Sequence, residues 1–360
     1  MNKPTFSKID TNICKGVAIL FMILHHAVAK YYNHFDLSWY AANSTSIPYE
    51  IMLFFSTAGK VCVSLLTILS GYGLAKSYSS FGENSIKGDI RFIVLRYIKL
   101  YSVFFPVVLI ITIVGVLQSA ISGEQIDLIQ VLKDTLKNLT IFKSSVGGWY
   151  LKAIFVLYLM FPILYRLIKK YGVIIIFLSA IPWILRYGFG IKPFRLDSFW
   201  YYILSFAVGI YAEQKDIFTR SRIREPATSI ILPITCLIAT FIMRLVFSLP
   251  MDLFFACSIV FLEMNVLSKL KSSAALNCLG TNSANMWLLH STFLHLMNGI
   301  HPLLKFVFAL LISLLASVLI EYLKGITKYN KLVSKVCGYL RGNPRDKQNG
   351  ISTEECIKKD

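Results

Sequence analysis

The sequence has few charged residues. They make up 16% of its 360 residues, whereas 56% are hydrophobic, and the mean hydropathy is +0.61. Soluble globular domains carry about 25% charged residues, so this composition excludes that class. The 37 Lys and Arg outnumber 19 Asp and Glu, but they form no cluster with aromatic residues on a polar face, which excludes a nucleic-acid-binding surface.

The sequence also lacks the cysteine spacing of metal and disulfide frameworks. No two of its seven cysteines are separated by two residues, as in the C-x-x-C pairs of zinc sites. Most lie in apolar runs or in stretches predicted to be cytoplasmic. We therefore expect neither a metal site nor a disulfide framework. Internal repeats, which would indicate a repeat architecture, are absent too.

Long apolar runs dominate what is present. There are ten, near residues 13–31, 53–74, 94–117, 149–168, 171–187, 198–212, 228–248, 251–267, 284–300 and 302–322. Stretches such as Val107–Val116 are apolar on every side, which predicts helices rather than barrel strands of alternating polarity. Three runs are short or interrupted (171–187, 198–212 and 284–300), so nine or eleven helices also fit. The prediction is an all-α polytopic membrane protein with about ten transmembrane helices. They form a single domain over residues 1–340, followed by a disordered tail over 341–360.

The basic residues orient these helices. With the N-terminus in the cytoplasm, 25 Lys and Arg fall in cytoplasmic segments and ten on the other side, while Lys15 and Lys152 lie in the membrane. Cytoplasmic loops are rich in Lys and Arg, so both termini are predicted to be cytoplasmic. A cleavable signal peptide is the competing interpretation of Gly16–Leu24 and Ala27–Ala29. The lysine and two histidines in that run, and the reversed loop charges that cleavage would leave, argue against it.

Three ionisable residues lie within the first apolar run. Such residues are costly in a membrane helix and mark a protein-lined or aqueous site. At 100° per residue, Lys15 and His26 share one face about 16 Å apart, whereas His25 is turned away by about 100°. In one interpretation, Lys15 binds an anionic cytosolic donor and His26 activates an acceptor from the far side. In the other, Lys15 extends to the interface and the histidines anchor the helix there.

Other candidate residues also have two interpretations. Arg96 and Lys99 are neighbours on one helical face, where they can bind phosphates or simply anchor the cytoplasmic end. Ser70 can bind substrate or support close helix packing. His290 is a second site residue or a buried core histidine. The remaining histidines are predicted to be interfacial: His34, His295 and His301.

Five short motifs follow one another in a fixed order. They are Lys15–His26, Ser70-Gly71-Tyr72, Arg96–Tyr101, Trp149-Tyr150-Leu151 and Met286–His290. In this order and spacing the chain, over about residues 10–295, resembles the acyltransferase-3 family. That family of integral membrane enzymes includes bacterial O-acetyltransferases of lipopolysaccharide, capsule and peptidoglycan.

The resemblance implies roles for eight residues. His26 stands at the essential histidine, which acts as general base or accepts the acyl group itself. Lys15 stands where the family usually has an Arg, and it loses the planar guanidinium. The donor-binding or substrate-binding set would be Arg96, Lys99, Ser70, Tyr72, Trp149 and His290. An acidic residue often found after the Trp motif is missing, since Lys152-Ala153-Ile154 occupies that stretch.

The expected function is that of an O-acyltransferase in the bacterial cytoplasmic membrane. It would move acetyl from acetyl-CoA to a hydroxyl of a surface or lipid-linked polysaccharide, without a metal. Its partners would be acyl-CoA, a carbohydrate acceptor and the bilayer. A transporter or flippase is the alternative, but that class predicts related halves and broken helices. A polysaccharide polymerase would need a long basic outer loop, whereas 118–148 balances three Lys against three acidic residues.

Overall fold

The structure is a bundle of helices. The computed structural model describes residues 6–29, 58–78, 81, 85–141, 146, 148–191, 197–247, 251–271, 273–297 and 299–341. These residues contain no strand, which confirms the all-α prediction. His34 and almost all of the predicted tail lie outside the described residues, so the disorder expected there stays a prediction.

Each predicted apolar run overlaps one helix. The ten helices are α1 (Lys8–Ala29), α4 (Val61–Tyr78), α5 (Ile86–Ile121), α7 (Gly148–Tyr171), α8 (Val173–Phe189), α9 (Asp197–Gln214), α11 (Pro226–Phe247), α12 (Asp252–Asn265), α13 (Ser273–Leu296) and α14 (Pro302–Ile326). Six of them, α1, α4, α5, α7, α11 and α14, are long and apolar enough to cross a membrane. The count of about ten spans therefore remains a prediction.

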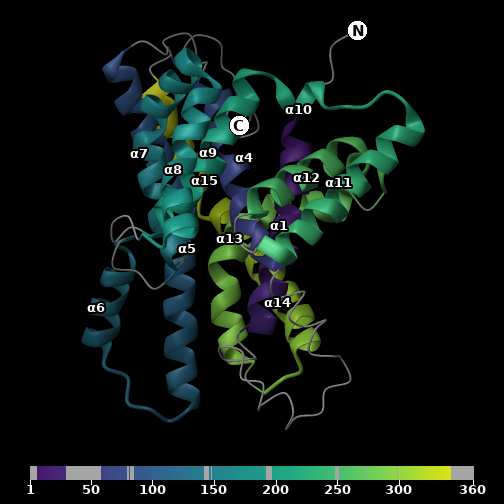
Figure 1. Ribbon diagram of the computed structural model, residues 1–360. Coiled ribbons are helices and arrows are strands. Elements are labelled where there is room, and N and C mark those ends of the chain that lie inside the picture. The colour runs from purple at the N-terminus through teal and green to yellow at the C-terminus, as the bar shows by residue number, and fades with distance from the viewer. Residues whose placement is uncertain are drawn as a thin grey trace.

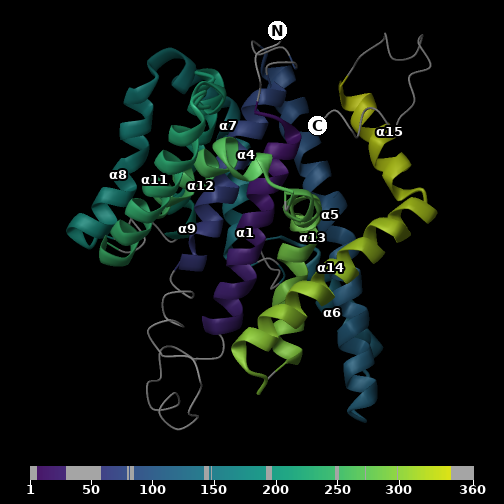
Figure 2. The same ribbon diagram turned by 90° about the vertical axis from the view of Figure 1, so that its right-hand side faces the viewer.

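Four shorter elements were not predicted. They are α6 (Leu128–Asn138), α10 (Ile217–Arg220), a 3₁₀ turn (Leu267–Lys269) and α15 (Tyr329–Arg341). Helices α6 and α15 are polar overall with an apolar stripe on one face, and α15 packs on α5 and α14 (Figure 2). A search for long apolar runs misses such helices because half of their residues are polar.

Helices α1, α4 and α13 occupy the middle of the bundle. Helices α7, α8 and α9 flank them on one side and α11 and α12 on the other (Figure 1). Two glycines let α1 and α13 pack backbone to backbone. A Cβ at Gly16 would collide with the Leu276 carbonyl, and one at Gly280 with the Asn12 carbonyl. The Asn12 side chain also donates a hydrogen bond to Asn277 Oδ1 at 3.1 Å. Small residues at helix crossings allow this close approach in membranes.

A second glycine pair joins α4 and α9. Gly71 meets the backbone of Phe206, and Gly209 meets the backbone of Ile68. The helix that carries Ser70-Gly71-Tyr72 is therefore a close-packing helix, as one of the two interpretations of Ser70 held. Its packing fixes the backbone from which Ser70 projects.

Candidate functional site

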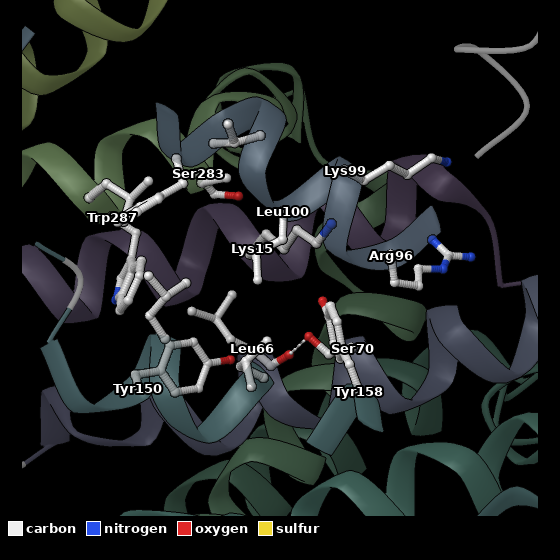
Figure 3. Close-up of a pocket in the computed structure, with 16 residues that line it drawn as sticks. Lys15, Leu66, Ser70, Arg96, Lys99, Leu100, Tyr150, Tyr158, Ser283 and Trp287 are labelled. Atoms are coloured by element: carbon white, nitrogen blue, oxygen red, sulfur yellow. Dashed lines mark hydrogen bonds between the residues drawn. The ribbon is translucent and has the colours of Figure 1, made fainter. Parts of the chain in front are cut away.

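Two cavities meet inside the bundle. The inner cavity, of about 280 Å³, lies between α1, α4, α5, α7 and α13 (Figure 3). The outer cavity, of about 580 Å³, is lined by the first turns of α1, the last turns of α4 and parts of α5 and α7. Four residues line both and form a waist between the cavities: Lys15, Ser70, Arg96 and Tyr158. Three of these four are predicted site residues.

The cavity walls are strongly basic. Five cations line one or both cavities: Lys8, Lys15, Lys76, Arg96 and Lys99. No carboxylate belongs to either wall as the described residues form it. We call the end of the bundle where α1 begins and α4 ends the basic end. A group of cations around a cavity attracts an anionic ligand.

Lys15 reaches this cavity system from α1. Its side chain is half-buried, and among the described residues it forms no hydrogen bond or ion pair. The structure therefore places its ammonium in the cavities between helices. This placement favours the donor-binding interpretation of Lys15 over the interfacial one.

Arg96 is held in place by its own surroundings. Its Nη2 donates a hydrogen bond to Ser77 Oγ on α4, and its guanidinium lies 4.8 Å from the centre of the Phe92 ring. Lys99, one turn further along α5, lines the inner cavity. The two cations thus share the face that the sequence predicted, and this face is turned to the cavities.

Hydroxyl groups face one another across the waist. Ser70 donates a hydrogen bond to the Leu66 carbonyl at 2.8 Å, and its side chain faces the phenols of Tyr150 and Tyr158 (Figure 3). The Tyr150 hydroxyl accepts a hydrogen bond from Thr67 Oγ1 at 3.5 Å. Besides the cations, these hydroxyl groups give a ligand in the inner cavity polar partners.

The histidines form a separate group. The rings of His26 and His290 lie 5.0 Å apart, and the ring of His25 lies 5.0 Å from that of His26. His290 is buried, and its Nδ1 lies 2.6 Å from the Trp287 carbonyl. Because a carbonyl can only accept, Nδ1 carries the hydrogen, and Nε2 is the basic nitrogen of the neutral ring. Neither histidine of the His26–His290 pair lines either of these two cavities.

Two predicted site residues are placed differently. Tyr72 lines the outer cavity, but its ring is mostly buried, stacked on Phe218 at 5.0 Å and edge-on to Phe6 at 5.1 Å. Trp149 lines neither cavity. It is 46% exposed and stacks on Tyr202 at 5.4 Å. The structure thus brings Lys15, Arg96, Lys99 and Ser70 together and leaves Trp149 outside.

The comparison with known families agrees with the order of motifs. The pattern that defines the acyltransferase-3 family, described as an acyltransferase domain, matches residues 9–323. The chain belongs to this family. Membership, together with the apolar helices, identifies it as a multi-pass membrane protein with acyltransferase activity. No curated protein and no solved structure matches it.

Residues other than the eight assigned roles also line the two cavities. The inner cavity is lined by Tyr150, Tyr158, Ser283 and Trp287, and the outer cavity by Lys8 and Lys76. Tyr150 and Trp287 lie in two of the five motifs, and the four-residue spacing of Tyr150, Ile154 and Tyr158 places those three on one helical face. The described residues contain no group of three His, Cys, Asp or Glu that could hold a metal ion.

Proposed function

We propose that this protein transfers an acetyl group from acetyl-CoA to a hydroxyl of a surface or lipid-linked polysaccharide. The observation that carries the proposal is the pair of joined cavities, basic at one end and aromatic at the other. A CoA thioester has the same polarity, with phosphates at one end and an uncharged arm ending in the acyl group. Cations that match phosphates give charge-assisted hydrogen bonds, the strong kind.

In this proposal the donor enters from the basic end. Lys8, Arg96 and Lys99 bind its phosphates, and the pantetheine arm passes the waist beside Lys15. The thioester then lies in the inner cavity near Tyr158 and Trp287. The basic end faces the cytoplasm of a bacterial cell, where acetyl-CoA is made, and both termini are cytoplasmic. The excess of basic residues predicted for that side supports this orientation.

His26 acts on the acceptor. As a general base it takes the proton of the sugar hydroxyl while the hydroxyl oxygen attacks the thioester carbonyl. The new C–O bond replaces the C–S bond, and the proton passes to the sulfur of the departing CoA. In the covalent variant, a nitrogen of His26 first accepts the acyl group and then gives it to the hydroxyl. His290, held by the Trp287 carbonyl, positions the imidazole of His26 in both cases.

The proposal is tested by the glycans of cells and by transfer in membranes. Strains that lack the gene, carry the wild-type gene or carry His26→Ala are compared by mass spectrometry of their surface glycans. An acetyl mass that is present only with the wild-type gene, on an unchanged glycan backbone, supports the proposal. An unchanged acetylation pattern with loss of surface export contradicts it and favours the transporter alternative. Radiolabelled acetyl-CoA added to isolated membranes then shows whether it is the donor.

A further inference from the structure

Two aromatic rings line the end of the inner cavity away from the basic end. Trp287 of α13 and Tyr150 of α7 both line this cavity, and their rings meet edge to face at 5.1 Å and 73°. Leu66 and Phe104 complete the apolar wall around them. In Figure 3, Trp287 and Tyr150 stand at one end of the cavity and Arg96 and Lys99 at the other.

The histidine pair lies behind this wall. His290 follows Trp287 by one helical turn and is hydrogen-bonded to its carbonyl. His26 contacts His290 and lies three residues before the end of α1, while Tyr150 lies two residues after the start of α7. Both helix ends are opposite the basic end. The two rings therefore stand between the donor cavity and the side of the bundle where the histidines lie.

The two rings are held in different ways. Tyr150 is buried and hydrogen-bonded through its hydroxyl to Thr67. Trp287 is half-buried and packs against all three hydrophobic cores of the bundle, but its indole N–H forms no hydrogen bond with any residue the structure describes. Tyr150 is thus fixed by packing and a polar bond, and Trp287 by packing alone. Of the two, Trp287 is the ring that no hydrogen bond holds against Tyr150 among the described residues.

We infer that Trp287, closed against Tyr150, is a septum that makes the enzyme a transferase rather than a hydrolase. The inference rests on the proposed function, because it requires an acyl thioester in the inner cavity. Water is the competing nucleophile. When its oxygen attacks the thioester carbonyl, the C–S bond breaks and a C–O bond forms, giving a carboxylic acid and CoA thiol. A closed aromatic wall keeps water from the histidine side away from the thioester until an acceptor is present.

Removal of the indole tests the inference directly. Trp287→Ala opens the wall, whereas Trp287→Phe keeps an aromatic ring there. Trp183→Ala on α8, which lines neither cavity, is the matched control. Membranes of equal protein content receive acetyl-CoA without acceptor, and release of CoA thiol is measured. We expect a several-fold rise for Trp287→Ala alone. Equal release from Trp287→Ala and the wild type, when both bind acetyl-CoA, would overturn the inference.

A measurement that does not depend on activity guards against misfolding. Ser283 lies in the inner cavity, and Ser283→Cys gives a thiol there. A membrane-impermeant maleimide is added to vesicles of either orientation, and labelling of the Ser283→Cys variant is compared with labelling of the parent chain. The extra labelling should occur from the basic end only. Adding Trp287→Ala should make the thiol reachable from both sides, and labelling from both sides without that change would contradict a closed septum.

The outcomes also separate the septum from the proposed function. If the wild type transfers acetyl normally but Trp287→Ala neither hydrolyses acetyl-CoA nor opens the inner cavity to the maleimide, the septum fails and the proposed function stands. If the wild type never uses acetyl-CoA, both fail.

Discussion

The rings of His26 and His290 lie 5.0 Å apart, although they come from the first helix and from α13. Helices α1 and α13 run parallel, since Asn12 meets Asn277 near one end of the contact and His26 meets His290 near the other. The hydrogen bond from His290 to the Trp287 carbonyl fixes the orientation of its ring. A fixed imidazole beside His26 limits the directions in which His26 can present its own nitrogens.

The first prediction separates the two adjacent histidines. His26→Ala should lower acyl transfer by about 100-fold or more, because general-base catalysis contributes at least that much. His25→Ala is the matched control and should be milder, since His25 is turned about 100° from the face that Lys15 and His26 share and lies beside Gly59. Transfer rates in membranes with equal protein levels measure both. Similar losses in the two variants would contradict the assignment.

His290→Ala probes the second ring of the pair. If His290 positions His26, this change should lower kcat while the KM for acetyl-CoA stays near its wild-type value, because His290 lines neither cavity. His290→Gln retains a donor for the Trp287 carbonyl and should recover part of the rate. A rise in KM with unchanged kcat would instead place His290 in donor binding.

Lys15 should act through its charge. Lys15→Ala should raise the KM for acetyl-CoA by about tenfold, the effect of losing one charged hydrogen bond, and Lys15→Arg should keep most activity. Lys15→Glu should be worse than Lys15→Ala, because a carboxylate repels the anionic donor. Lys152→Ala is the matched control, since Lys152 is the other predicted intramembrane lysine and lines neither cavity. If the KM for acetyl-CoA is unchanged in Lys15→Ala, Lys15 only extends to the membrane interface.

Arg96 should contribute mainly to binding of the phosphates. Arg96→Gln should raise the KM for acetyl-CoA and weaken its dependence on salt, because one cation is lost from the wall. The control is Arg91→Gln on the same helix, where the side chain is exposed and lines neither cavity. The initial rate is measured against acetyl-CoA concentration at two ionic strengths. Equal changes in both variants would mean that only general surface charge matters.

The α1–α13 contact should tolerate no side chain at Gly280. Gly280→Ala places a Cβ against the Asn12 carbonyl and should cost about 1–3 kcal/mol of stability, as overpacking does. Gly115→Ala on α5 is the control, because no atom lies within 4 Å of the added Cβ. It should leave stability unchanged or raise it slightly. Thermal unfolding in detergent compares the two, and equal midpoints would contradict the close contact.

Most residues of the waist could be predicted from the sequence, whereas the contact between the rings of Trp287 and Tyr150 could not. Lys15, Arg96 and Ser70 stand out because charged or hydroxyl groups are rare in apolar helices. Trp287 and Tyr150 fall within two of the motifs, but most aromatic residues simply fill the core in a chain with 26 Phe, 19 Tyr and 5 Trp, so the sequence does not show that these two rings meet.

The neighbourhood of His26 and His290 could not be predicted either. Helical periodicity places His26 on the face of Lys15, but it says nothing about which helix packs there. That depends on the glycine contacts between α1 and α13, whose partners are carbonyl groups far away in the sequence. Helix α5 shows the same limit, because its 36 residues span about 54 Å, well beyond the apolar run that predicted it.

The pairing of α1 with α13 also has a consequence for biosynthesis. The helix that carries His26 leaves the ribosome first, and its partner emerges only after about three quarters of the chain has been made. Until then neither the histidine pair nor the Trp287 wall of the inner cavity exists. A nascent or truncated chain that ends before α13 therefore has part of the basic wall but no centre for transfer. Under the proposed function such a chain cannot transfer acyl groups, and activity begins only after α13 has been inserted.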